Sequence, residues 1–113
     1  MKEQINFEDF GKVDLRIGNI IEVKDFPKAR VPAYQLTIDF GSIGIKNSSA
    51  QITDLYSKED LLHKQVIAVV NFEKKQIANF FSECLVLGIK NSQNQVVLLK
   101  ASHESLTKGE QIS

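Results

Sequence analysis

The chain has 113 residues, of which 42% are hydrophobic and 25% are charged, as in one ordinary globular domain. Its 14 lysine and arginine residues balance its 14 aspartate and glutamate residues, which excludes an overall basic surface. Any nucleic-acid binding must therefore come from a local cluster of basic residues. Only Arg16 and Arg30 are arginines, which argues against specific reading of bases, for which arginine is preferred.

Cysteine and histidine usage excludes several site chemistries. Cys84 is the single cysteine, so we expect a buried, unreactive thiol inside a strand rather than a disulfide. With only His63 and His103 besides, no zinc pattern exists, and glycine-rich phosphate-binding motifs are absent. We expect no cofactor, no metal and no enzymatic activity.

The N-terminal residues 1–11 carry acids where a signal peptide needs an apolar stretch, and no apolar run has the length of a membrane span. We therefore expect a cytoplasmic protein without membrane insertion.

The first predicted element is a short helical turn over residues 6–10, capped by Asn6 and stopped by Gly11. Phe7 and Phe10 are three positions apart and are expected to face inward together. Residues 1–12 then form either a lid over one end of a barrel or an element that meets a second subunit.

Alternating apolar residues predict a long strand over residues 13–23. Gly18 interrupts this strand, and we expect a bulge or sharp bend there that lets one strand serve two sheets. A proline-bounded loop follows at 25–32 and carries Lys28 and Arg30, for which solvated positions are the simplest interpretation.

The cleanest half-buried strand is predicted over residues 33–40, and a weaker one over 43–50. Lys46, Ser48 and Ser49 in the weaker strand suit an exposed, ligand-facing surface, although turn chemistry explains the two serines equally well.

The only sizeable helix is predicted over residues 53–62, with Ser57 as its cap and its leucines, Leu55, Leu61 and Leu62, facing the core. Three further strands are expected, at 65–70, 84–89 and 96–99. Residues 96–113 form a C-terminal extension whose strand edges, at 96–99 and 111–112, are candidates for a dimer contact.

Residues 71–83, between the strands at 65–70 and 84–89, are unlike a tight hairpin loop, which would carry Asn-Gly or Gly-Gly. They combine positive charge with aromatic rings, as single-stranded or irregular RNA requires. A structural alternative stays open, in which the apolar residues are core and the lysines are a solvated tip. The residues concerned are Phe72, Lys74, Lys75, Ile77, Phe80 and Phe81.

About six short strands and one helix, separated by turn signals, predict an all-β fold in a single domain of residues 1–113. We expect a five-stranded Greek-key barrel of the oligonucleotide- and oligosaccharide-binding (OB) type, with one intervening helix and short flanking N- and C-terminal elements. The helix falls between the third and fourth strands, as it does in such barrels.

Three motifs in this order resemble those of the tRNA-binding domain family: 14–20 (DLRIGNI), 71–75 (NFEKK) and 82–88 (SECLVLG). Four further segments, 26–33, 38–41, 45–53 and 65–72, resemble its CsaA branch, the export-associated chaperone-like members. The resemblance runs from about Phe7 to the C-terminus.

The resemblance implies an OB-fold homodimer, formed through elements flanking the barrel, that binds the outer, structured part of tRNA without sequence specificity. The CsaA branch implies chaperone-like binding of unfolded or preprotein segments in protein export. The alternative is a protein–protein interaction module associated with an aminoacyl-tRNA synthetase, with only incidental RNA contact.

Carried over position by position, the resemblance implies a nucleic-acid-binding face of Lys46, Ser48, Ser49, Asn71, Lys74, Lys75 and Ser82. It implies a peptide-binding groove of Phe72, Ile77, Phe80 and Phe81, with Arg30 at its rim. Lysines contact phosphates, and Asn and Ser side chains donate to sugar or phosphate oxygens. Two residues depart from the family pattern: Glu73 replaces a common proline, and Asn79 a common glycine. An acid beside the lysines is expected to weaken phosphate attraction.

Overall fold

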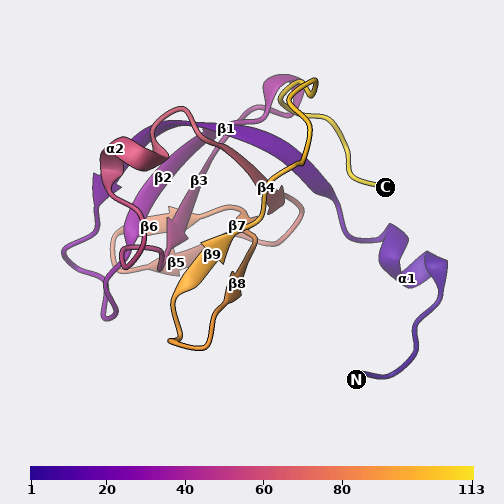
Figure 1. The fold of residues 1–113 in the computed structure, drawn as a ribbon, viewed down its shortest axis with the longest axis horizontal. Coiled ribbons are helices and arrows are strands. Elements are labelled where there is room, and N and C mark those ends of the chain that lie inside the picture. The colour runs from indigo at the N-terminus through magenta and orange to yellow at the C-terminus, as the bar shows by residue number, and fades with distance from the viewer.

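The computed structural model describes all of residues 1–113, and its body is a nearly closed antiparallel barrel (Figure 1). Five strands lie in the order β3-β2-β1-β4-β7, which confirms the expected OB-type barrel. The elements are α1 (Phe7–Gly11), β1 (Leu15–Asp25), β2 (Tyr34–Asp39), the 3-10 helix η1 (Gly41–Ile43), β3 (Ile45–Ala50), α2 (Lys58–Leu61), β4 (Gln65–Val69), β5 (Lys75–Ile77), β6 (Phe80–Ser82), β7 (Leu85–Val86), β8 (Gly88–Lys90) and β9 (Val96–Leu98).

The long strand β1 pairs with β4 through its first half and with β2 through its second half, within one five-stranded sheet rather than the two sheets expected from the sequence. The bulge between these halves lies at Ile20–Glu22, beyond Gly18, so the predicted position was wrong. Gly18 instead allows close packing, because a Cβ there would lie only 2.5 Å from the ring of Phe40.

Apolar side chains from β1, β2, β4 and α2 fill the barrel, and their removal from water is the main stabilising contribution. The alternation predicted for β2 is confirmed, since Leu36, Ile38 and Phe40 are fully buried. Ile20 and Val66 join them in the same core cluster.

Helix α2 is shorter than the predicted helix over 53–62. Ser57 caps it as expected, because the Ser57 hydroxyl accepts a hydrogen bond from the Asp60 N–H at 3.1 Å. Leu61 is fully buried, but Leu55 and Leu62 are exposed, which corrects two expected core positions. Residues before Ser57 form a turn, and His63 takes a positive φ of 70° that ends the helix and leads into β4.

Residues 71–83 form a hairpin of their own, which the sequence analysis did not predict. β5 pairs with β6 around a turn of Ala78 and Asn79, and Ala78 takes a positive φ of 54° in place of the expected glycine. The strand predicted over 84–89 is divided: β7 pairs with β4, whereas β8 pairs with β9 in a separate hairpin.

The predicted N-terminal helix is present, with Asn6 and Asp9 forming a capping box. It stands clear of the barrel at the right of Figure 1, and Phe7 is 94% exposed, so Phe7 and Phe10 do not face inward. The helix therefore does not cover the barrel in the single chain, and its contact with a second subunit stays a prediction.

The C-terminal segment runs along the start of β1. The Gly109 N–H donates to the Ile17 carbonyl oxygen at 2.7 Å, and the Ile112 N–H donates to that of Leu15 at 2.9 Å. One of the two predicted free edges, at 111–112, is thus already paired within the chain. None of the helices combines the length and the apolar character that a bilayer crossing requires.

Candidate nucleic-acid interface

An open hollow of about 960 Å³ lies between the loop joining β1 to β2 and the β5–β6 hairpin. We name it the cationic hollow. It is lined by Lys28, Ala29, Arg30, Val31, Ala33, Ser49, Gln51, Lys75, Gln76, Ile77 and Ala78. OB barrels bind oligonucleotides over their second and third strands, between the loops in these positions.

The lining of the cationic hollow includes three cations, Lys28, Arg30 and Lys75, and no carboxylate. None of the three forms an ion pair within the chain, since the ion pairs present use Arg16, Lys24, Lys58 and Lys108. Unpaired like charges around a concave surface concentrate positive potential, which attracts phosphates. A chain of zero net charge therefore has the local basic cluster that nucleic-acid binding requires.

The cationic hollow combines residues from both predicted sites. Ser49 and Lys75 were predicted to bind nucleic acid, whereas Arg30 and Ile77 were predicted to bind peptide. Lys74 is exposed on the chain leading into β5, and Lys46 is half-buried on β3, but neither lines this hollow.

Three residues predicted for the nucleic-acid face make contacts within the barrel. Ser48 is only 1% exposed and donates its hydroxyl to the Cys84 carbonyl oxygen at 2.9 Å, so RNA cannot reach it in this structure. The Asn71 side chain accepts from the Asp14 N–H at 3.0 Å and donates to the Lys12 carbonyl oxygen at 2.7 Å. The Ser82 hydroxyl accepts from the Ser49 N–H at 3.1 Å, which leaves its proton and one lone pair for a ligand.

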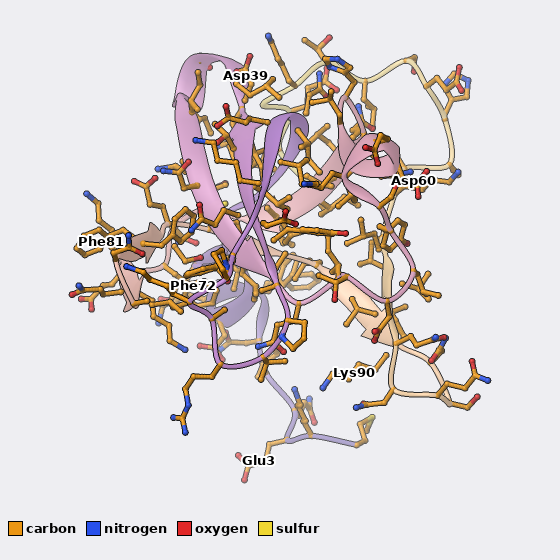
Figure 2. All side chains as sticks on the ribbon, turned by 90° about the vertical axis from the view of Figure 1, so that its left-hand side faces the viewer. Glu3, Asp39, Asp60, Phe72, Phe81 and Lys90 are labelled. Carbon is orange, nitrogen blue, oxygen red and sulfur yellow. The ribbon has the colours of Figure 1, made fainter.

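The four apolar residues predicted to form a peptide groove do not share one surface. Ile77 and Phe80 face each other across the hairpin, and alternation along β6 places Phe81 on its opposite face. Figure 2 shows Phe81 at the outer left end of the molecule and Phe72 nearer the barrel. Phe80 packs on Phe26, so packing explains one of the rings, whereas Phe72 and Phe81 are 59% and 51% exposed.

Phe72 lines a second hollow of about 440 Å³, which we name the apolar hollow. The other residues lining it are Glu73, Lys75, Ser82, Glu83, Cys84 and Leu85. Lys75 is shared with the cationic hollow, but Glu73 is not. The acid that departs from the family pattern therefore shares the apolar hollow with Lys75 but does not line the cationic hollow.

Side chains close the barrel between β3 and the segment before β7. The Glu83 N–H donates to the Asn47 carbonyl oxygen at 2.8 Å, and the Glu83 carboxylate accepts from the Asn47 N–H at 3.0 Å. Cys84 is buried as predicted, and this burial raises the pKa of its thiol to about 11. These contacts make the seam a structural feature rather than a binding surface.

Sequence reasoning did not assign Lys28, Gln51 and Gln76 to a site, although each lines the cationic hollow. Lys28 and Arg30 stand in a loop that the sequence describes as solvated, and Lys75 lies far along the chain. The OB topology could have indicated this site from the sequence. It places the loop joining β1 to β2 opposite the connection that carries Lys75.

Residues 15–111 match the model of a putative tRNA binding domain. The chain is 51% identical to crystal structures of the CsaA chaperones of Bacillus anthracis and Picrophilus torridus, with TM-scores of 0.91 and 0.90. These alignments cover 98% and 97% of this chain and 100% of each CsaA chain.

A curated relative, the methionine–tRNA ligase of Pyrococcus horikoshii, is 38% identical over 97 residues. This match covers 86% of the chain but only 13% of the ligase, so the chain corresponds to a small part of that protein.

Proposed function

Because the chain belongs to the tRNA-binding domain family, we propose that it binds tRNA in the cationic hollow and that it does so without catalysing a reaction. The observation that carries this proposal is the cluster of Lys28, Arg30 and Lys75, free of carboxylates, between the two loops that OB barrels use for oligonucleotides. The same family membership supports a cytoplasmic location, where tRNA is found.

The lining of the hollow suits recognition of RNA shape rather than sequence. Three cations contact phosphates, while the side chains of Ser49, Gln51 and Gln76 offer hydrogen bonds to sugars and phosphates. Arg30 is the only arginine there, and arginine is the residue most often used to read guanine. Binding should therefore be of modest affinity and depend strongly on salt.

Titration of the purified protein with bulk tRNA at several salt concentrations tests this proposal. Three phosphate contacts predict that the logarithm of the association constant falls linearly with the logarithm of salt concentration, with a slope between about −2 and −3. Absence of binding at low salt would contradict the proposal.

A second function, chaperone-like binding of unfolded or preprotein segments as in protein export, is supported by the similarity to the CsaA chaperones and by the apolar hollow. Phe72 and Leu85 are exposed at this hollow, where they offer apolar surface to an extended segment.

Titration with an unfolded polypeptide tests this second function. We expect binding that survives physiological salt and is lost in Phe72→Ser. Ile89→Ser is the matched control, because Ile89 is 60% exposed on β8 and lies outside the hollow. Equal loss in both variants would indicate nonspecific apolar contact.

We also propose a homodimer in which α1 contacts the second copy. Phe7 and Phe10 project from an element that stands clear of the barrel, and Ile5 beside them is exposed as well. Sedimentation should show no monomer at micromolar concentration, and Phe7→Asp should dissociate the dimer. A monomer in the parent protein would contradict this part of the proposal.

The alternative function, an interaction module associated with an aminoacyl-tRNA synthetase, is supported by the similarity to methionine–tRNA ligases. It predicts that the protein co-elutes with a purified synthetase and binds tRNA only weakly alone. Tight tRNA binding by the isolated protein argues against it.

A further inference from the structure

Two aromatic rings join the two walls of the cationic hollow. The ring centroids of Phe26 and Phe80 lie 5.4 Å apart, with an angle of 60° between the ring planes. Tilted aromatic pairs at this separation are favourable beyond the apolar area that they bury. Phe26 is only 4% exposed and is held within the barrel, whereas Phe80 on β6 is half-buried.

Each ring belongs to an element that forms one of the two walls. Phe26 is the first residue of the loop that carries Lys28 and Arg30, and Phe80 lies on β6 opposite Ile77. In the hairpin register Lys75 pairs with Ser82, two positions along from the Ile77–Phe80 pair, so Lys75 and Phe80 share one face of the hairpin.

No hydrogen bond or ion pair joins residues 26–33 to residues 75–82. The base of the hairpin is held to β3 through Ser82 and Glu83, and its tip is the turn at Ala78. The aromatic pair therefore adds a direct contact between the hairpin and the loop, beyond the anchors of the hairpin base on β3.

We propose that Phe80, packed on Phe26, is a positioning residue for nucleic-acid binding: it holds Lys75 opposite Lys28 and Arg30, so that all three cations engage one RNA backbone at once. This inference rests on the proposed tRNA binding in the cationic hollow. Preorganisation is the physical reason, because cations held in place before binding need not be ordered by the ligand.

A double-mutant cycle between Phe80 and Lys75 tests the inference. The affinity for tRNA is measured against salt concentration in the parent protein, Lys75→Ala, Phe80→Leu and the double variant. In the parent, Lys75→Ala should reduce the salt slope by about 0.7 to 0.9, the contribution of one phosphate contact. In the Phe80→Leu background the same change should have almost no effect on the slope, because Lys75 no longer reaches the shared backbone.

Two further variants separate positioning from folding. Phe81→Leu alters the next residue, whose side chain lies on the other face of the hairpin, and should leave tRNA affinity unchanged. Phe80→Tyr retains the ring and should retain the parental slope. If Phe80→Leu fails to fold, Phe80→Met, which keeps apolar volume without a ring, takes its place in the cycle.

An equal effect of Lys75→Ala with and without the Phe80 ring would overturn the positioning role while leaving tRNA binding intact. If Lys75→Ala leaves the slope of the parent protein unchanged, the assignment of Lys75 to the RNA site fails, and the inference fails with it. The two failures are thus distinguished within one experiment.

Discussion

The hydroxyl of Ser48 donates a hydrogen bond to the Cys84 carbonyl oxygen, 2.9 Å away, across the seam where β3 meets the segment before β7. Ser48 is the one polar residue among the buried side chains. Its neighbour Asn47 exchanges hydrogen bonds with Glu83 in the same seam. The barrel is therefore closed here by side chains that replace part of a backbone ladder.

Replacing Ser48 with alanine should destabilise the protein by about 1 to 3 kcal/mol, because the Cys84 carbonyl oxygen would remain buried without this donor. Urea unfolding measures the change. The slope of tRNA affinity against salt should stay at its parental value, since Ser48 does not reach the ligand. A lowered slope in a stable Ser48→Ala variant would return this residue to the binding face.

The Cys84 thiol should react slowly with a thiol reagent in the folded protein. Burial raises its pKa to about 11, from an ordinary value of 9.0, so almost no thiolate is present near neutral pH. Because the folded pKa exceeds the unfolded one, the protein should also lose stability as the pH rises through 9.0. Reaction in native buffer as fast as in denaturant would contradict this.

Ala78→Gly should stabilise the hairpin by up to about 1 kcal/mol. Ala78 has a positive φ of 54°, where a Cβ is crowded and glycine is not. Thermal unfolding of this variant should occur at a slightly higher temperature than in the parent. Destabilisation would mean that the Ala78 side chain makes a favourable contact that outweighs the strain.

Stability should fall on acidification partly through Asp39. The Lys108 ammonium, with its Nζ 2.7 Å from Oδ2, and the Gly41 N–H lower the pKa of Asp39 below its ordinary value of 3.8. Since the folded pKa is the lower one, this contribution is present above pH 3.8 and is lost as the pH falls through the folded pKa. The urea midpoint is measured as a function of pH in the parent protein and in Lys108→Met. The variant should lose less stability over this acidic range than the parent. Identical curves would exclude the Asp39–Lys108 pair as a cause.

Local rules in the sequence predicted the elements that depend on neighbouring residues. Asn6 and Ser57 both cap helices as expected, and the alternation from Leu36 to Phe40 placed β2 and its buried face correctly. Capping and alternation act within a few positions, so they are visible in the sequence.

Features fixed by distant contacts could not be predicted in this way. The β5–β6 turn uses Ala78 where the sequence rule asks for glycine, and the strain is accepted in a hairpin whose Phe80 packs on Phe26. Leu55 was expected in the core because its side chain is apolar. It is exposed instead, because it precedes the start of α2.

Only part of the candidate site could be predicted, because the site joins segments that are distant in the sequence. Lys75 stood out beside aromatic residues in the sequence, whereas Lys28 was inconspicuous in a polar loop. Only the barrel brings the loop of Lys28 opposite the hairpin of Lys75. The burial of Ser48 could not be predicted, because a serine in an alternating strand gives no sign of a partner on a distant segment.

The most direct test of tRNA binding in the cationic hollow compares two triple variants of equal charge. One carries Lys28→Ala, Arg30→Ala and Lys75→Ala, and the other replaces three lysines outside the hollow, Lys2, Lys24 and Lys100, with alanine. The salt slope of tRNA binding should lose about 2 to 3 in the first variant and remain near the parental value in the second. Equal losses in both would show that overall charge attracts the RNA, and would contradict a site in the hollow.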